Sequence, residues 1–221
     1  MITLYCLRRL GDPPPPDGLV GIGGAAVRVV REGMMAAWVS EGSSPAADVT
    51  SVRAHDAVVR SALRSATPVP ARFGTVFTDE AELSASLRER GEELWAALER
   101  VQGRVEMGVV VEWEDLPESP PGGPIRSGRA YLERRRQAIE ADRSRRERAE
   151  GLLGRVEAQL ARDGVAAVRT LLPARGVAGT VAHLVHRQEA RSYRTRVEAA
   201  RDLHAGVGLY LTGPWAPYSF V

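Results

Sequence analysis

The residues that most constrain the fold are the last eleven, Leu211 to Val221, which read LTGPWAPYSFV. Chain ends are normally polar and solvated, whereas this one carries Trp215, Tyr218 and Phe220 together with two prolines. Burying three aromatic side chains contributes on the order of 10–15 kcal/mol. Ordering each backbone residue costs roughly 1–2 kcal/mol. The tail is therefore ordered only if its aromatic surface finds a groove, either within the protein or on a partner.

Length and composition are those of a soluble globular protein. The 221 residues are 44% hydrophobic and 26% charged, and this length suits one large or two small domains. No stretch reaches the roughly 18 apolar residues that a membrane span needs. The amino terminus lacks the basic lead and cleavage site of a signal peptide, and the single cysteine, Cys6, allows no internal disulfide. We expect a cytoplasmic protein that does not contact the membrane.

The first half of the chain alternates strands with helices. Hydrophobic periodicity predicts strands over 1–9, 25–31, 34–39, 71–77 and 104–113 and helices over 50–65 and 79–101. This order favours an α+β fold, in which residues 1–113 form an N-terminal ferredoxin-like α/β sandwich with additions.

A proline- and glycine-rich segment, EDLPESPPGGPIR, then predicts a linker over 114–127. Residues 128–221 are expected to form a second, C-terminal α+β domain. A long helix should start at Gly128 and end near Asp163, as one helix or as two in line. A small antiparallel sheet should follow from strands at 165–172, 179–186 and 206–211, with a helix over 189–203 and the aromatic tail after the last strand.

The beginning of that long helix is rich in arginine. Between Arg126 and Glu150 there are nine arginines and five acidic residues, a local excess of four positive charges. Several acids lie three or four residues from an arginine, which favours a solvated helix with ion pairs along it. The alternative is that helix 126–148 binds an acidic partner or a phosphate backbone. Tyr131 is the one aromatic residue in this stretch, which weakens a single-stranded nucleic-acid interpretation.

The segment ARFGTVF, from Ala71 to Phe77, combines arginine and aromatic residues on a predicted strand. Glycine within a strand, here Gly74, marks a bulge or a close backbone approach. Exposed arginine and aromatic side chains are enriched at interfaces, so Arg72, Phe73 and Phe77 are candidate partner contacts. Alternatively, the two phenylalanines belong to the core and Arg72 forms a buried ion pair.

No catalytic, cofactor or metal site is predicted. The chain contains no G-x-S-x-G, P-loop, HExxH or paired CxxC motif. His183 and His186 are three residues apart on a predicted strand, so their side chains point to opposite faces and cannot share one ion without a bulge. We therefore expect a protein that is not an enzyme.

Three segments resemble the GvpF/GvpL family of gas vesicle proteins. They are the terminal LTGPWAPYSFV, the stretch PVPARFGTVF that ends at Phe77, and GRAYLER at 128–134, which follows a Glu-x-Gly-Val-x-Val-like strand at 106–111. They occur in the family's order and span most of the chain. The departures are alanine at position 216, where the family has proline, and a shortened, proline-rich segment at 12–17.

This resemblance implies an accessory or minor structural protein that binds the main shell protein and assists vesicle assembly, together with other gas vesicle accessory proteins. It implies a location in the cytoplasm, at the gas vesicle. Pro214, Trp215, Tyr218 and Phe220 are then expected to dock the tail between the two domains. The alternative function is a nucleic-acid or polyanion binder that uses the arginine-rich helix. Binding to phosphates should weaken steeply as salt rises, whereas binding to an apolar shell protein should not.

Overall fold

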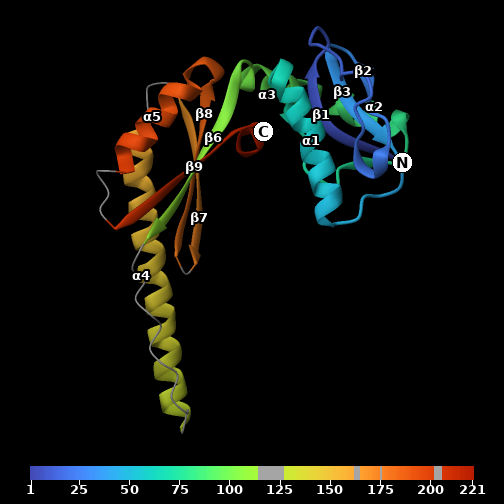
Figure 1. Ribbon diagram of the computed structural model, residues 1–221. Coiled ribbons are helices and arrows are strands. Elements are labelled where there is room, and N and C mark those ends of the chain that lie inside the picture. Colours follow the sequence, from blue (N-terminus) through green and yellow to red (C-terminus); the bar gives the residue numbers. More distant parts are fainter. Residues whose placement is uncertain (114–126, 162–164, 175, 202–205) are drawn as a thin grey trace. The chain divides into compact units, whose positions relative to one another are not determined.

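A computed structural model describes residues 1–113, 127–161, 165–174, 176–201 and 206–221 (Figure 1). The described chain contains two antiparallel sheets and their helices, and the predicted α+β class is confirmed. Contacts divide it into two compact units. The first unit comprises residues 1–106, 184–188 and 213–221, and the second comprises 107–183 and 189–212.

The first unit is a sheet with three helices. Its strands are β1 (Ile2–Arg9), β2 (Arg28–Glu32), β3 (Met35–Glu41), β4 (Val69–Pro70) and β5 (Val76–Phe77). Its α-helices are α1 (Val49–Ser65), α2 (Glu80–Glu89) and α3 (Gly91–Val101), and a short 3-10 helix, η1, spans Ile22–Gly24. The strand order is β2-β3-β1-β4, with β5 also paired to β1.

The core of this unit lies at the central strands. β1 and β3 are buried on both faces, as expected of apolar strands with neighbours on each side. A buried cluster joins Tyr5 and Trp38 of the sheet to Val58 and Val59 of α1, and it also contains Ala216 of the tail. Helix α1 begins after Asp48, whose carboxylate accepts a hydrogen bond from the Ser51 backbone N–H at 2.7 Å and so caps the helix.

The predicted continuous strand over 71–77 is wrong. The chain pairs with β1 on both sides of a turn, at Pro70 and again at Val76. The Thr75 backbone N–H donates to the Arg72 carbonyl at 3.1 Å and closes the turn. Gly74 lies at φ +86°, a conformation that favours glycine and interrupts a strand. The turn consequently carries Arg72 and Phe73 out of the pairing.

The predicted single helix over 79–101 is two helices. α2 ends at Glu89 and α3 begins at Gly91, because Arg90 leaves helical geometry with φ −98° and ψ 16°. Glycine at the junction lowers the cost of breaking the helix. Asp79 caps α2 by accepting from the Glu82 backbone N–H at 2.9 Å.

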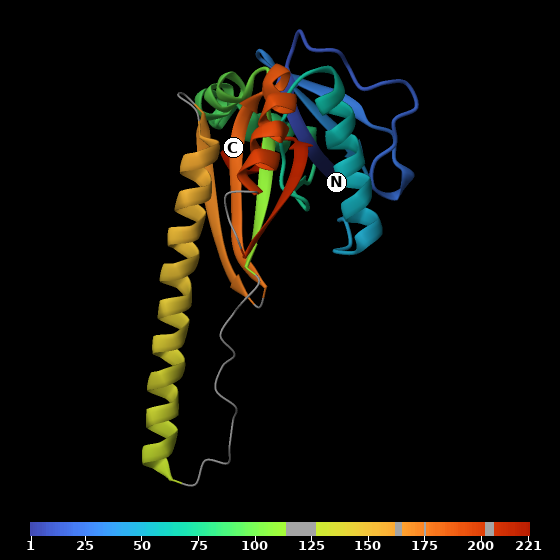
Figure 2. The ribbon, with the colours of Figure 1, turned by 60° about the vertical axis from the view of Figure 1, so that its left-hand side comes forward.

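The second unit is a sheet with two helices packed against it. Its strands are β6 (Arg104–Trp113), β7 (Ala166–Ala174), β8 (Val177–His186) and β9 (Val207–Trp215), in the order β7-β8-β6-β9. Its α-helices are α4 (Gly128–Leu160) and α5 (Ala190–Arg201). The 3-10 helix η3 (Tyr218–Phe220) belongs to the first unit, and η2 (Arg187–Glu189) has residues in both units. Figure 2 shows α4 running beside the sheet and continuing past its end.

α4 is one uninterrupted helix of 33 residues. Ser127 caps it by accepting from the Ala130 backbone N–H at 3.2 Å. Its later half contributes Leu152, Leu153 and Val156 to the core of the unit and packs on β7 and α5. Leu152 and Val156 are four residues apart and therefore lie on one face of the helix.

The last strand is longer than predicted and includes the first part of the tail. β9 runs to Trp215 rather than ending at Leu211. Contacts group residues 213–221 with the first unit, although they follow the second unit in sequence. The predicted linker at 114–127 lies, except for Ser127, outside the described residues, and the domain boundary there stays a prediction.

Candidate partner-binding groove

A groove of about 440 Å³ lies on α1, within the first unit. Side chains at spacings of three and four along the helix form its floor. Two other segments complete its walls: Phe73 from the turn between β4 and β5, and Trp215, Ala216 and Tyr218 from the tail. We call this the α1 groove. Its α1 residues are Val52, Arg53, His55, Asp56, Val59 and Arg60.

His55 orders the centre of the groove. Its ring lies edge-on to Phe73, with centroids 5.8 Å apart, and 5.3 Å from the Tyr5 ring. His55 Nε2 donates to the Ala71 carbonyl at 3.1 Å, so the helix holds the turn that carries Phe73. Burial lowers the pKa of His55, against the opposing effect of the Ala71 hydrogen bond. The imidazole is therefore neutral at physiological pH.

Arg60 of α1 contacts the aromatic tail. The Arg60 guanidinium lies 4.5 Å from the centre of the Trp215 ring, a cation–π contact. Arg60 is itself paired with Asp56, one turn earlier, at 2.7 Å. Burial raises the pKa of the Tyr218 hydroxyl, and the negative charge of Asp56 adds to the rise. Tyr218 thus remains an uncharged donor at the edge of the groove.

The end of the tail is fixed by hydrogen bonds. Arg100 of α3 donates to the Phe220 carbonyl from Nε at 3.0 Å and from Nη2 at 2.7 Å. The Glu106 carboxylate accepts from the backbone N–H and the hydroxyl of Ser219, both at 2.8 Å. These charge-assisted bonds hold η3 on the first unit, where Phe220 is buried. Tail ordering thus rests on polar anchors as well as on aromatic burial.

The predicted site residues fall into two groups. Phe73, Trp215 and Tyr218 line the α1 groove. The remaining predicted residues lie outside its lining. Arg72 is exposed in the turn, Phe77 is half-buried in β5 opposite Ile2, Pro214 is exposed, and Phe220 is buried. The expected role of the tail in joining two domains stays a prediction.

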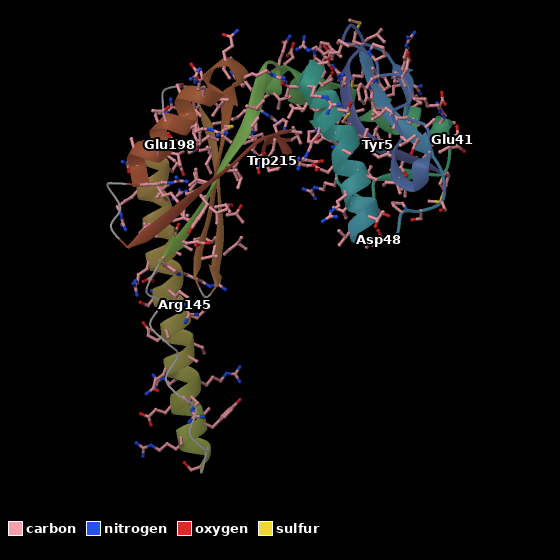
Figure 3. All side chains as sticks on the ribbon, in the orientation of Figure 1. Tyr5, Glu41, Asp48, Arg145, Glu198 and Trp215 are labelled. Atoms are coloured by element: carbon pink, nitrogen blue, oxygen red, sulfur yellow. The ribbon has the colours of Figure 1, made fainter. Side chains whose placement is uncertain are left out.

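Sequence reasoning missed Asp56 and Arg60, although their i, i+4 spacing on a helix signals an ion pair. It also assigned no role to His55. Nothing in the sequence indicates that Trp215 meets Arg60. That contact forms because the tail packs with the first unit, which also contains Arg60. Figure 3 labels Trp215 in the tail.

The lining of the groove is suited to binding a partner. Val52 is 46% exposed and Tyr218 is 39% exposed, so apolar and aromatic surface faces outward. Among the described residues no group of histidine, cysteine and carboxylate side chains is arranged to hold a metal ion. Aromatic side chains around an apolar floor, with one ion pair at the rim, match the composition of interface centres.

The arginine-rich half of α4 is exposed, and side chains project from it around its axis beyond the labelled Arg145 (Figure 3). Arg143 pairs with Glu147 at 2.9 Å and Arg146 with Asp142 at 3.1 Å. These pairs favour the solvated-helix interpretation, and polyanion binding stays a prediction. Despite the length of α4, the described residues contain no helix apolar enough to span a membrane.

Comparison with known proteins gives a consistent result. The profile of the family "Gas vesicle synthesis protein GvpL/GvpF" matches residues 2–221. Gas vesicle protein L of a Streptomyces species is 36% identical, over 98% of this chain and 91% of its own.

Two solved structures share the fold. The crystal structure of GvpF from Anabaena has a TM-score of 0.76 at 17% identity, and it covers 99% of this chain and 94% of its own. That of GvpF from Microcystis aeruginosa has a TM-score of 0.74 at 16% identity, with 99% and 98% covered. The family match over nearly the whole chain, with the resemblance of its terminal motif, shows that this protein belongs to the GvpL/GvpF family of gas vesicle proteins.

Proposed function

We propose that this protein is an accessory or minor structural protein of the gas vesicle, which binds the main shell protein and assists assembly of the vesicle in the cytoplasm. The family description names gas vesicle synthesis, and the shell protein that the family implies is small and very apolar. Such a chain aggregates in water unless its apolar surface is covered. The proposal assigns binding, with other gas vesicle proteins as further partners, and no catalytic step.

The observation that carries the proposal is the α1 groove. Its apolar and aromatic lining is partly open to solvent, yet its walls are fixed by the hydrogen bonds of His55 and of the tail. A preformed groove loses little conformational entropy on binding, which favours affinity. Its open volume accommodates a few apolar side chains of an extended or helical segment. Phe73, Trp215 and Tyr218 are the aromatic contacts that we assign to the shell protein.

Val52→Asp is expected to weaken retention of the shell protein about tenfold or more, because a carboxylate in the groove must be desolvated when an apolar segment binds. Val52 is 46% exposed, so the substitution leaves the fold intact. The measurement is a pull-down of tagged protein with the main shell protein, quantified across a series of salt concentrations.

Val49→Asp is the matched control. Val49 belongs to the same helix and is 65% exposed, but it does not line the groove. Retention should be unchanged in this variant and should persist at high salt. The proposal fails if the wild-type protein retains no shell protein at any salt concentration. The assignment to the groove fails if the two aspartate variants behave alike.

A further inference from the structure

A second hollow in the first unit, of about 450 Å³, is strongly basic. Three arginines from separate parts of the chain line it: Arg9 at the end of β1, Arg64 in the last turn of α1, and Arg187 after β8. We call it the Arg187 pocket. Buried Thr67 and Leu98 line its inner side, and Asp12 is the one acidic residue in its lining. It shares no lining residue with the α1 groove.

Hydrogen bonds fix both the backbone and the guanidinium group of Arg187. Its backbone N–H donates to the Gly103 carbonyl at 2.9 Å. Its Nη2 donates to the Leu63 carbonyl at 2.7 Å and lies 3.4 Å from Thr67 Oγ1. Thr67 in turn donates to the Arg104 carbonyl at 2.6 Å. These bonds occupy one nitrogen of the guanidinium and orient the others.

The side chains of the other two arginines are also positioned without a carboxylate, although the Asp12 carboxylate accepts from the Arg9 backbone N–H at 3.2 Å. Arg64 donates from Nη2 to the Ser61 hydroxyl, one turn back on the same helix, at 2.9 Å. Arg9 lies over the Trp95 ring, 4.9 Å from its centre, and its buried Nε has no hydrogen-bond partner in the described part of the chain. A buried N–H without an acceptor is unfavourable, so an acceptor that entered the pocket and reached this N–H would be bound favourably.

The positive charges of the pocket are not neutralised by carboxylates of its own lining. Asp12 is committed to the fully buried Arg8, whose Nε lies 3.5 Å from the Asp12 carboxylate. Across the described residues, none of Arg9, Arg64 and Arg187 forms an ion pair with a carboxylate. Three positive charges thus share one hollow, and an anion that binds there is attracted by all three.

We propose that the Arg187 pocket binds a phosphate-type oxyanion, either free or as the phosphoryl group of a small molecule. Guanidinium groups donate two parallel N–H bonds to such oxygens. A phosphoryl group offers enough acceptor oxygens for three arginines that approach from different directions, whereas a single carboxylate offers two. The volume exceeds that of one phosphate and leaves room for more of the ligand.

Arg64→Gln is the variant that tests this, because Arg64 is exposed and its hydrogen bond is local to its own helix. Titration calorimetry at fixed ionic strength with inorganic phosphate, pyrophosphate and ATP is expected to show saturable binding of at least one of them. Loss of one charge-assisted contact should raise its Kd about tenfold or more in Arg64→Gln. Binding of phosphate or pyrophosphate identifies the free anion as sufficient, and binding of ATP alone identifies a larger phosphorylated molecule.

The matched control is Arg31→Gln, an exposed arginine of β2 with the same loss of charge, which lies outside both this pocket and the α1 groove. Its Kd should equal that of the wild type. The proposal is overturned if all three probes fail to bind, if citrate binds as tightly as they do, or if Arg31→Gln weakens binding as much as Arg64→Gln. None of these results bears on binding of the shell protein, since the α1 groove is separate.

Discussion

Ala216→Asp is expected to lower the free energy of unfolding by about 3–5 kcal/mol, the cost of leaving a charge buried without a partner. Ala216 is 3% exposed and packs in one cluster with Tyr5, Trp38 and Val59. A carboxylate there either destabilises the core of the first unit or expels the tail from it. Urea unfolding measures the first result, and carboxypeptidase digestion of the folded protein measures the second.

Ala57→Asp provides the comparison, because Ala57 is exposed on α1 and the same substitution there costs less than about 1 kcal/mol through helix propensity. If Ala216→Asp unfolds like Ala57→Asp and its tail remains protected from carboxypeptidase, then the tail does not contribute to the core. If the tail is instead expelled, the α1 groove loses the wall formed by Trp215 and Tyr218.

Acidification from about pH 7.5 to about pH 5 is expected to remove about 2 kcal/mol of stability through His183 alone. His183 is fully buried, and its Nδ1 lies 2.8 Å from the Tyr193 hydroxyl. Burial, aided by the charge of Arg196, lowers its pKa from 6.5 to about 4. At a pH between these two pKa values, the histidine is protonated in the unfolded chain but not in the folded protein. The contribution of His183 to the free energy of unfolding is therefore fully present above about pH 6.5 and is lost as the pH falls toward 4. The lowered pKa of His55 acts in the same direction.

The measurement is urea unfolding at several pH values for the wild type and for His183→Gln. Glutamine can still hydrogen-bond to Tyr193 but does not titrate, so the decline between about pH 7.5 and pH 5 should shrink by about 2 kcal/mol. His186→Gln removes an exposed histidine from the same strand and should leave the decline unchanged. Equal declines in the wild type and in His183→Gln would contradict the assignment.

Local patterns predicted most of the elements, because their signals lie within each segment. Asp79 marks the start of a helix, the apolar spacing around Leu152 indicates a helix, and the alternation of apolar residues in β6 indicates a strand. The failures also have local causes. Gly74 interrupts a predicted strand, and Gly91 interrupts a predicted helix. When secondary structure is predicted from the pattern of a whole segment, one glycine lowers the strand or helix propensity only slightly, so neither interruption was predicted.

The candidate site was only partly predictable from the sequence. Aromatic composition identified Phe73 and Trp215, and the family resemblance supplied their motifs. That both line one groove depends on long-range packing: β9 returns residues 213–221 to the first unit, and the turn at Gly74 carries Phe73 to His55. The Arg187 pocket also depends on long-range packing, because its three arginines come from segments that are far apart in the sequence. No pattern of residue spacing predicts that they meet.

The return of the tail also bears on when the protein can fold during translation. Strand β1 is made first, but the cluster that surrounds Tyr5 is incomplete until Ala216 has left the ribosome. Domains whose residues are synthesised early usually fold early, whereas here the first unit is completed only after residues 213–221 have been synthesised. A chain truncated before residue 213 therefore lacks Ala216 from the cluster around Trp38, and its α1 groove lacks the wall formed by Trp215 and Tyr218.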